Sequence, residues 1–351
     1  MHFLVTGHTG FKGSWLTEML LQLGHSVSGM AYNTDEGTLY SVCNSKDKLS
    51  DDLEVDIRNR EEVAAALQAV SPDFVIHLAA QALVRKSYLL PTETFDTNFT
   101  GTMNVMIAAE ETPSVKGILV ITTDKVYKND NSGKPFSETD PLGANDPYSA
   151  SKAAADLYAQ SFSTFSKLKS VVVRAGNVIG GGDVCIDRLV PDVVTKIRSE
   201  QTLELRYPQA IRPWQHVLDC LDGYLTILAN WQRVPNGSVW NVGPDPTYQL
   251  SVLEIVNELY GQFGVEPNVR VENNQVFKES ISLSLDVSKL KDVLGHSSRL
   301  TLDETVSWTA NFHRRVWSGE SPQDVIQSQV SDYLNNKSQV SFENLSVEHF
   351  L

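Results

Sequence analysis

The sequence predicts an α/β protein whose first half forms a doubly wound parallel sheet and whose second half adds a smaller lobe. Three observations lead to this prediction. Short apolar runs alternate with longer amphipathic segments as far as about residue 176, at the spacing of strand–helix–strand units. A glycine-rich turn follows the first apolar run. The chain has 351 residues, more than the roughly 250–300 that one hydrophobic core usually holds.

The strands and helices of the first half follow from these apolar runs and from the residues that flank them. Apolar residues at helical spacing predict a helix over 15–23, ended by Gly24, and a second over 59–70, opened by Asn59. Two further helices are expected over 92–110 and 148–165. Strands are expected over 3–5, 27–31, 53–55, 74–78, 117–122 and 170–174.

The regular alternation ends after Gly176. Glycine, proline and aromatic residues become more frequent there, and predicted helices over 217–231 and 251–263 are separated by irregular stretches. We therefore expect a first domain over 1–176, to which later segments return, and a smaller α/β lobe over 177–335 that binds the substrate. A polar tail is expected over 336–351.

Composition excludes several classes of protein. With 29 basic and 43 acidic residues, the net charge of −14 argues against a nucleic-acid partner, because such binding needs a basic face. No run approaches the roughly 18 apolar residues of a membrane span. The three cysteines lack C-x-x-C spacing, so we expect no zinc or other metal site and a reducing compartment. The apolar start is too short for a signal peptide, which predicts a cytoplasmic protein.

Three glycines, Gly7, Gly10 and Gly13, follow the first strand and open the first helix. In this context they predict a Rossmann-type phosphate loop, because glycine lets the backbone approach a pyrophosphate at a helix N-terminus. The expected contacts of the dinucleotide include the residues between these glycines. These are Thr9, Phe11 and Lys12.

The rest of the dinucleotide site is expected at the ends of the next strands. The second strand ends without the acidic residue that often holds the adenosine ribose, and Asn33 is the candidate in its place. No arginine follows that strand to hold a 2′-phosphate, which favours NAD over NADP. Further contacts are expected after the third and fourth strands, from Asp56, Ile57, Leu78, Ala79, Ala80 and Gln81.

Tyr148 and Lys152 open the helix after the fifth strand, at the edge of the sheet where ligands bind. Residues at i and i+4 share one helix face. A neighbouring ammonium and the positive nicotinamide ring would both favour the phenolate, so the pKa of Tyr148 is expected to fall toward neutrality. Tyr148 would then act as a base for a sugar hydroxyl.

A polar cluster ends the fifth strand and should face the same cleft. It comprises Thr122, Thr123, Asp124 and Lys125. An acid beside a possible base suggests more than hydride transfer, because loss of water needs one group to protonate the departing hydroxyl and another to take a proton from carbon. A solvated turn with a local ion pair is the alternative.

The glycine loop, the Tyr148–Lys152 pair and Asn177 resemble those of the extended short-chain dehydrogenases that act on nucleotide sugars. Longer strings resemble the CDP-glucose 4,6-dehydratases within that family. These strings are VTGHTGFKGSWL (5–16), TTDKVY (122–127), PLGANDPYSASK (141–152), RAGNVIGGGD (174–183), DRLVPD (187–192) and IRPWQHV (211–217). The Asp124–Lys125 pair is specific, since most sugar-nucleotide dehydratases have Asp-Glu there.

The resemblance implies a redox-neutral dehydration in deoxysugar and O-antigen-type polysaccharide synthesis, with NAD as cofactor and CDP-glucose or a related nucleotide sugar as substrate. Tyr148 and Thr123 would act on the 4-hydroxyl, and Asp124 would protonate the departing 6-hydroxyl. Lys125 would either take the C5 proton as a neutral amine or stabilise the enolate as an ammonium. The resemblance also adds Asn98 and Thr122 to the cofactor contacts, together with Tyr148 and Lys152. It gives as substrate contacts Asn177, Arg85, Arg188, Arg206 and Arg212.

The sequence departs from the family pattern at Val184, Lys278 and His296, which leaves the exact nucleotide and sugar open. A dehydratase or 4-epimerase acting on another nucleotide sugar is the alternative within the enzymes, and a non-catalytic dinucleotide sensor is the alternative outside them. The helices near 94–110 and 149–165 resemble the family's dimer bundle, so a homodimer or a higher homo-oligomer is expected.

Overall fold

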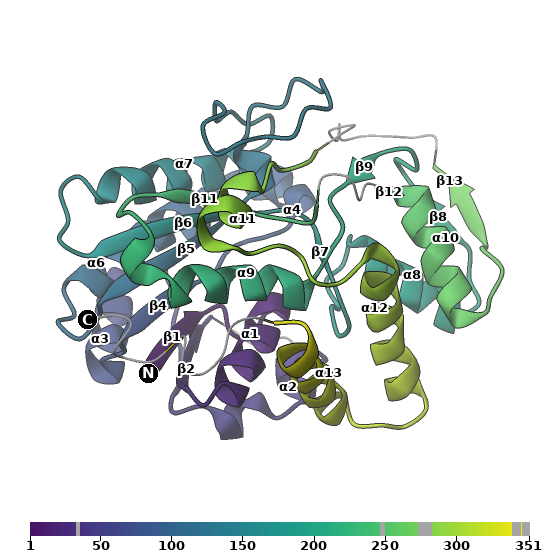
Figure 1. Cartoon of the computed structure of the whole chain (residues 1–351), viewed down its shortest axis with the longest axis horizontal. Helices are drawn as coiled ribbons and strands as arrows, with labels where there is room; N and C mark the ends of the chain where they lie inside the picture. The colour runs from purple at the N-terminus through teal and green to yellow at the C-terminus, as the bar shows by residue number, and fades with distance from the viewer. Residues whose placement is uncertain (33–35, 246–249, 273–282, 339–344, 346–351) are drawn as a thin grey trace.

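The computed structural model describes residues 1–32, 36–245, 250–272, 283–338 and 345. Figure 1 shows a large twisted sheet covered by helices on both faces, with a smaller group of helices and short strands at one end. This is the predicted doubly wound α/β fold. The residue limits expected for the two domains stay a prediction.

The central sheet has seven strands in the order β11-β6-β5-β4-β1-β2-β3, and every neighbouring pair is parallel. The strand order reverses between β1 and β4, and ligands bind outside the carboxyl ends of the strands at such a point. The strands are β1 (His2–Thr6), β2 (Ser26–Ala31), β3 (Asp52–Glu54), β4 (Phe74–His77), β5 (Gly117–Thr123), β6 (Lys169–Ala175) and β11 (Val239–Val242).

Helices cover both faces of this sheet, which is why its strands are runs of apolar residues. Phe3 and Val5 belong to the core on one face, with α1 and α9, whereas Leu4 belongs to the core on the other, with α3, α6 and α7. The flanking helices are α1 (Phe11–Gln22), α3 (Arg60–Val70), α6 (Gly101–Glu110), α7 (Pro147–Phe162) and α9 (Val217–Ala229).

The smaller lobe is built on three two-stranded sheets and has its own apolar core, which includes Val193, Trp214 and Leu259. Its strand pairs are β7 (Val178–Ile179) with β10 (Gln215–His216), β9 (Ile211–Arg212) with β12 (Leu250–Ser251), and β8 (Leu203–Leu205) with β13 (Val269–Val271). Its helices are α8 (Leu189–Arg198), α10 (Val252–Phe263) and α12 (Leu302–Trp317).

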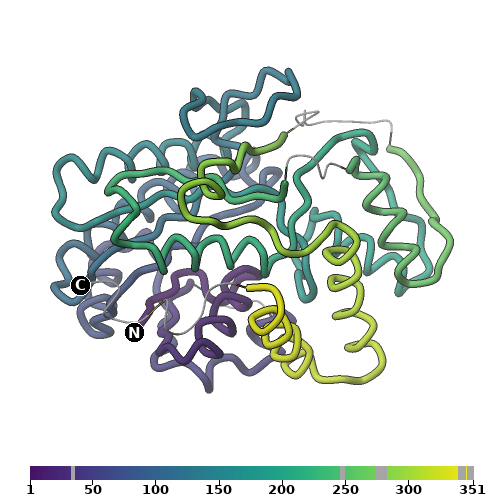
Figure 2. The backbone as a smooth tube through the Cα atoms, viewed as in Figure 1, coloured from purple at the N-terminus to yellow at the C-terminus, as the bar shows by residue number. Residues whose placement is uncertain are grey.

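Short helices connect these parts. They are α2 (Leu39–Val42), η1 (Ser45–Lys48), α4 (Val84–Leu89), α5 (Pro91–Phe95), η2 (Asp96–Thr100), η3 (Asp124–Val126), η4 (Trp231–Arg233) and α11 (Ser288–Leu294). The last helix, α13 (Pro322–Asn336), returns to lie beside α1, as the yellow and purple segments of Figure 2 show. There Gln22 Nε2 donates to the carbonyl oxygen of Gln327 (3.0 Å).

Several predicted boundaries change. The helix expected over 92–110 contains a π-helical turn, η2, and the helix expected to reach Phe165 ends at Phe162. The helix expected to reach Trp231 ends at Ala229 and is followed by η4. Most of the expected tail lies outside the described residues, but Asn336 is helical and Leu345 is buried in a core.

Candidate active site

The glycine loop leaves no space for side chains on its inner side. A Cβ on Gly13 would lie 2.2 Å from the carbonyl oxygen of Gly7, and one on Gly7 would lie 2.8 Å from the amide nitrogen of Ala79. Gly7 also has a positive φ of 72°, which favours glycine. The exposed Gly10 then caps α1. Thr9, Phe11 and Lys12 are half-buried around this turn, which therefore fits a dinucleotide pyrophosphate.

The end of β4 is held beside this loop by a chain of hydrogen bonds. Thr6 Oγ1 accepts from the amides of Leu78 (3.1 Å) and Ala79 (3.2 Å). The buried Asn98 accepts from the amide of Gln81 (2.7 Å) and donates to its carbonyl (3.0 Å) and to Ser151 (2.9 Å). Ala80 is half-buried between them. Asn98 therefore ties β4 to α7 and positions the predicted contacts.

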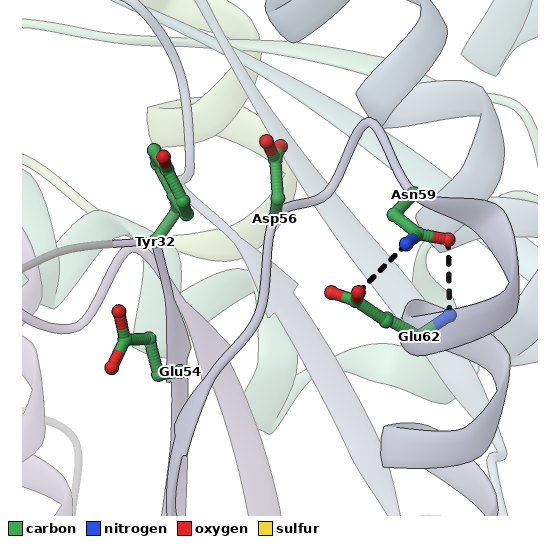
Figure 3. Close-up of a pocket in the computed structure, with 5 residues that line it drawn as sticks. All are labelled: Tyr32, Glu54, Asp56, Asn59 and Glu62. Atoms are coloured by element: carbon green, nitrogen blue, oxygen red, sulfur yellow. Dashed lines mark hydrogen bonds between the residues drawn. The ribbon is translucent and has the colours of Figure 1, made fainter.

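The adenosine end of the predicted cofactor site lies at the tips of β2 and β3. A pocket of about 450 Å³ opens there, lined by Tyr32, Glu54, Asp56, Asn59 and Glu62 (Figure 3). Ile57 is buried beneath it, and its carbonyl accepts from Asn104 Nδ2 (3.0 Å). Asn33, the predicted ribose contact, lies outside the described residues.

Tyr148 and Lys152 are both buried on the first turns of α7. Asp146 caps this helix by accepting from the amide of Ser149 (2.8 Å), and Ser87 Oγ accepts from the amide of Tyr148 (3.1 Å). Lys152 Nζ donates to the carbonyl of Ile121 at the end of β5 (2.8 Å). The pair is therefore fixed against the carboxyl edge of the sheet, as predicted.

The expected effect on the Tyr148 pKa does not occur in the protein alone. Burial raises the pKa of Tyr148 to about 12, an effect that outweighs the opposing interactions with Thr123 and Arg188. Burial also lowers the pKa of Lys152 to about 8. The prediction that the ammonium and the nicotinamide ring together bring the pKa of Tyr148 toward neutrality stays a prediction, and it requires their combined charge to outweigh the loss of solvent.

Asp124 follows β5 in η3 and is almost completely buried, with 1% of its surface exposed. Thr123 Oγ1 donates to Asp124 Oδ1 (3.0 Å), while Oδ2 has no hydrogen-bond partner among the described residues. Burial raises the pKa of Asp124, although Lys125, Arg212 and Lys12 act in the opposite direction. A buried carboxyl with one oxygen unpartnered is suited to carry a proton and donate it.

Thr122 faces the interior. Its hydroxyl donates to Asp156 Oδ2 (2.9 Å), which also accepts from Arg174 Nε (2.9 Å). The Arg174–Asp156 ion pair is fully buried, and the guanidinium lies over the ring of Tyr127. The Thr122 side chain is thus part of the support beneath the site.

Three of the predicted substrate residues, Arg85, Arg188 and Arg206, form ion pairs with Asp183 or Asp187. Arg188 donates to Asp183 (2.9 Å) and is close enough to Tyr148 for each to influence the pKa of the other. Arg85 from α4 donates to Asp187 (2.7 Å), and Arg206 lies 3.7 Å from the same carboxylate oxygen. Asp187 therefore links Arg85 of α4 to Arg206, which follows β8.

The two other predicted substrate contacts lie nearby. Arg212 is buried, and its charge acts to lower the pKa of Asp124. Asn177 is half-buried between β6 and β7, and its backbone carbonyl accepts from the amide of Gln215 (3.3 Å). Of the departures from the family pattern, Val184 is exposed in the loop before Arg188. His296 lies elsewhere, 3.4 Å from Asp222 on α9. Lys278 is outside the described residues.

Sequence reasoning missed the partners of several site residues. Lys12 Nζ donates to Tyr224 Oη on α9 (3.1 Å), although the two residues are 212 positions apart. Ser87 and Asp187 are the other omissions, and both stand within two residues of predicted arginines. In the described part of the chain, no group of three or more His, Cys, Asp or Glu side chains is arranged to hold a metal ion. No helix there is long and apolar enough to cross a membrane.

The chain matches the family described as "NAD dependent epimerase/dehydratase family" over residues 3–243. It is 35% identical over 343 residues to a CDP-glucose 4,6-dehydratase of Salmonella typhimurium, with 94% of this chain and 95% of the relative covered. It is 27% identical to a dTDP-glucose 4,6-dehydratase of Xanthomonas campestris, with 89% and 92% covered.

Solved structures agree with this match. The dTDP-glucose 4,6-dehydratase of Streptomyces venezuelae, solved with NAD bound, is 26% identical and superposes with a TM-score of 0.81, covering 90% of this chain and 98% of its own. A UDP-glucose 4-epimerase of Thermus thermophilus has the same fold, with a TM-score of 0.78 at 24% identity and 90% and 99% coverage.

Proposed function

The chain belongs to the NAD dependent epimerase/dehydratase family, its cofactor is NAD, and from this premise we propose that it converts CDP-D-glucose to CDP-4-keto-6-deoxy-D-glucose. The observation that carries this proposal is the buried Asp124, which accepts from Thr123 at Oδ1, has Oδ2 unpartnered among the described residues, and is close enough to Tyr148 to affect its pKa. Elimination of water needs such an acid, whereas 4-epimerisation does not. The CDP nucleotide is supported by the 35% identity to a CDP-glucose enzyme.

Tyr148 begins the reaction by taking the proton of the glucose 4-hydroxyl, with Thr123 hydrogen-bonded to the same oxygen. When bound, NAD accepts a hydride from C4 and returns it to C6 later in the cycle. The C4 ketone makes the C5 proton acidic. Asp124 gives its proton to the departing 6-hydroxyl, which leaves as water. Lys152, one turn after Tyr148 on α7, places a cationic group at the end of β5, where its amine donates to the Ile121 carbonyl.

Lys125 is proposed to act at the C5 proton, a role supported by its place directly after Asp124 in the short helix η3. Two roles fit this position. A neutral amine takes the C5 proton directly, whereas an ammonium stabilises the enolate while another group moves the proton. The Lys125→Met change separates the two roles through solvent exchange at C5. Exchange stops if Lys125 is the base, and it continues slowly if Lys125 only stabilises charge.

The four predicted arginines and Asn177 are proposed to hold the nucleotide diphosphate. A guanidinium matches the oxygens of a phosphate with two parallel hydrogen bonds. Arg188 and Arg212 approach Tyr148 and Asp124, so they would hold the substrate near the reacting groups. Arg85 and Arg206 both approach the carboxylate of Asp187. A phosphate group of the substrate would bind to the two guanidinium groups in the same way.

We also propose that the protein is a cytoplasmic homodimer that serves deoxysugar and lipopolysaccharide synthesis. None of its three cysteines forms a disulfide in the described part of the chain, in keeping with a reducing compartment. The exposed face of α4, α7 and the turn after α7 carries apolar side chains, including Leu89, Leu157 and Phe165. A second copy of this chain would cover that face.

The direct test is incubation of the purified protein with NAD and, separately, CDP-glucose, dTDP-glucose, UDP-glucose and GDP-mannose. CDP-glucose should give a 4-keto-6-deoxy product, detected by mass spectrometry as loss of one water. The Tyr148→Phe variant should keep its fold and lose on the order of 10²–10⁴-fold in rate. Product from another nucleotide sugar alone would reject CDP-glucose, and a C4 epimer without loss of water would reject dehydration.

A further inference from the structure

The structure brings an arginine to the tip of β2, where the sequence alone indicated none. Arg58 follows β3, yet its guanidinium lies over the ring of Tyr32, with Cζ 5.7 Å from the ring centroid. Tyr32 is the residue directly after β2. In dinucleotide folds, the tip of this strand faces the adenosine ribose, and an arginine there accommodates the 2′-phosphate of NADP. Arg58 thus occupies a position that would favour NADP.

The guanidinium of Arg58 is already engaged by Asp56. Arg58 Nε lies 3.0 Å from Oδ1 and 2.9 Å from Oδ2, and Nη2 lies 2.6 Å from Oδ2. The backbone amide of Arg58 also donates to Asp56 Oδ1 (3.0 Å). The hydrogen bonds to Arg58 hold the pKa of Asp56 below its usual range, so the carboxylate stays charged at neutral pH. The ion pair therefore directs these donors away from any other anion.

The walls of the adjacent pocket add negative charge. Three of its five lining residues are carboxylates, Glu54, Asp56 and Glu62, and Figure 3 shows them on the strand β3, the loop after it and the first turn of α3. A ribose hydroxyl is uncharged and is not repelled by them. A 2′-phosphate carries nearly two negative charges and would be repelled unless a free cation compensated.

We propose that Asp56 determines this chain's preference for NAD over NADP by holding Arg58 in an ion pair. The preference is then set by a carboxylate after β3 that neutralises the arginine, rather than by an acidic residue at the end of β2. This inference rests on the family's dinucleotide and on the geometry at Arg58, and it is independent of which sugar is dehydrated. Removing the carboxylate should release the guanidinium toward the ribose.

The test measures which dinucleotide the full-length protein retains. Three proteins are compared: wild type, Asp56→Asn and the double variant Asp56→Asn/Arg58→Met. Each is incubated to equilibrium with NAD and NADP at equal concentrations, both in excess over the protein, and is then gel-filtered. Bound nucleotides are released with acid and quantified by chromatography. Since both dinucleotides share the adenine, any general loss of adenine binding cancels in the NADP-to-NAD ratio. Asp56→Ser repeats the experiment should the asparagine variant fold poorly.

The ratio should rise on the order of tenfold in Asp56→Asn, because a charge-assisted pair with phosphate replaces the internal one. It should return to the wild-type value in the double variant. Glu62→Gln is the matched control, since it removes a carboxylate of the same pocket whose side chain accepts from Asn59. An unchanged ratio in Asp56→Asn, an equal rise in Glu62→Gln, or a rise that persists without Arg58 would overturn the proposal.

Discussion

At the scale of single residues, burial acts on two acidic groups of the site with opposite consequences. Asp124 and Tyr148 are both buried, and burial raises the pKa of each. For Asp124 this is an advantage, because the group must carry a proton at neutral pH before it can donate one. For Tyr148 burial opposes formation of the phenolate. The positive charge of the bound cofactor would act against burial and lower the pKa of Tyr148.

The two steps of the reaction should therefore respond differently to Asp124→Asn. Asparagine keeps the shape of the side chain but cannot donate a proton as an acid, whereas oxidation at C4 depends on Tyr148 and Thr123. Rapid mixing with CDP-glucose should show the absorbance of reduced cofactor appearing with little dehydrated product. Equal slowing of both steps would mean that Asp124 only shapes the site.

Lys152 should make the stability of the fold depend on alkaline pH. Its pKa is about 8 in the folded protein and 10.5 in the unfolded chain, so the unfolded state binds more protons between these values. The free energy of unfolding should consequently rise from pH 8 to 10.5, by up to roughly 3 kcal/mol. Urea unfolding of wild type and Lys152→Met across this range tests the point. A parallel pH dependence in both proteins would exclude Lys152 as the cause.

At the scale of elements, the predictable parts are those whose pattern is local. Buried apolar runs located the strands of the first half, and Asn59 located the start of α3. The π turn at η2 has no local signal, because its buried Asn98 is explained only by partners on β4 and α7. The helix α12 was also missed, since its buried face includes polar residues such as Thr305 and Thr309.

The candidate site divides in the same way. Its glycines and the Tyr148–Lys152 pair lie within short motifs and could be read from the sequence. The contacts of Lys12 with Tyr224 and of Arg85 with Asp187 join residues that are 212 and 102 positions apart, so only the fold reveals them. The place of Arg58 beside Tyr32 is likewise not visible in the sequence, because the two residues are joined only by the pairing of β2 with β3.

The turn between β1 and α1 should not tolerate a methyl group at Gly13. An alanine Cβ would lie 2.2 Å from the Gly7 carbonyl oxygen and 2.6 Å from the Cα of His8, both backbone atoms. Gly13→Ala should lower the free energy of unfolding by about 1–3 kcal/mol and greatly reduce bound NAD. Gly261→Ala is the control, because that helical glycine has open space around it. There alanine should stabilise by about 0.4–1 kcal/mol; equal behaviour of the two variants would contradict the close-packed turn.

At the scale of the whole molecule, the site is assembled where the two lobes meet. Tyr148 and Asp124 come from the large sheet, Arg188 and Arg212 come from the smaller lobe, and α9 contributes Tyr224 from beneath the sheet. The return of β11 to the sheet and of α13 to α1 closes the large lobe around the same core. In the proposed site, the relative position of the lobes would therefore determine whether substrate and cofactor meet.

The exposed apolar face should be the dimer interface. Leu157 and Phe165 are 55% and 64% exposed on and just after α7, and burying such side chains stabilises association. Leu157→Glu should shift the protein from dimer to monomer in sedimentation measurements, because it places a charge within an apolar contact. Val265→Glu, which changes an exposed apolar residue after α10, should leave the assembly unchanged. A monomeric wild type would refute the proposed interface.

The central claim is that hydride leaves C4 and returns to C6 of the same sugar. The measurement that tests it most directly uses CDP-glucose deuterated at C4 and locates the label in the product by NMR. The account predicts deuterium in the C6 methyl group, with no net accumulation of reduced NAD. A 4-keto-6-deoxy product without deuterium at C6, deuterium at C4 of a 4-epimer, or reduced NAD accumulating in step with product would contradict it.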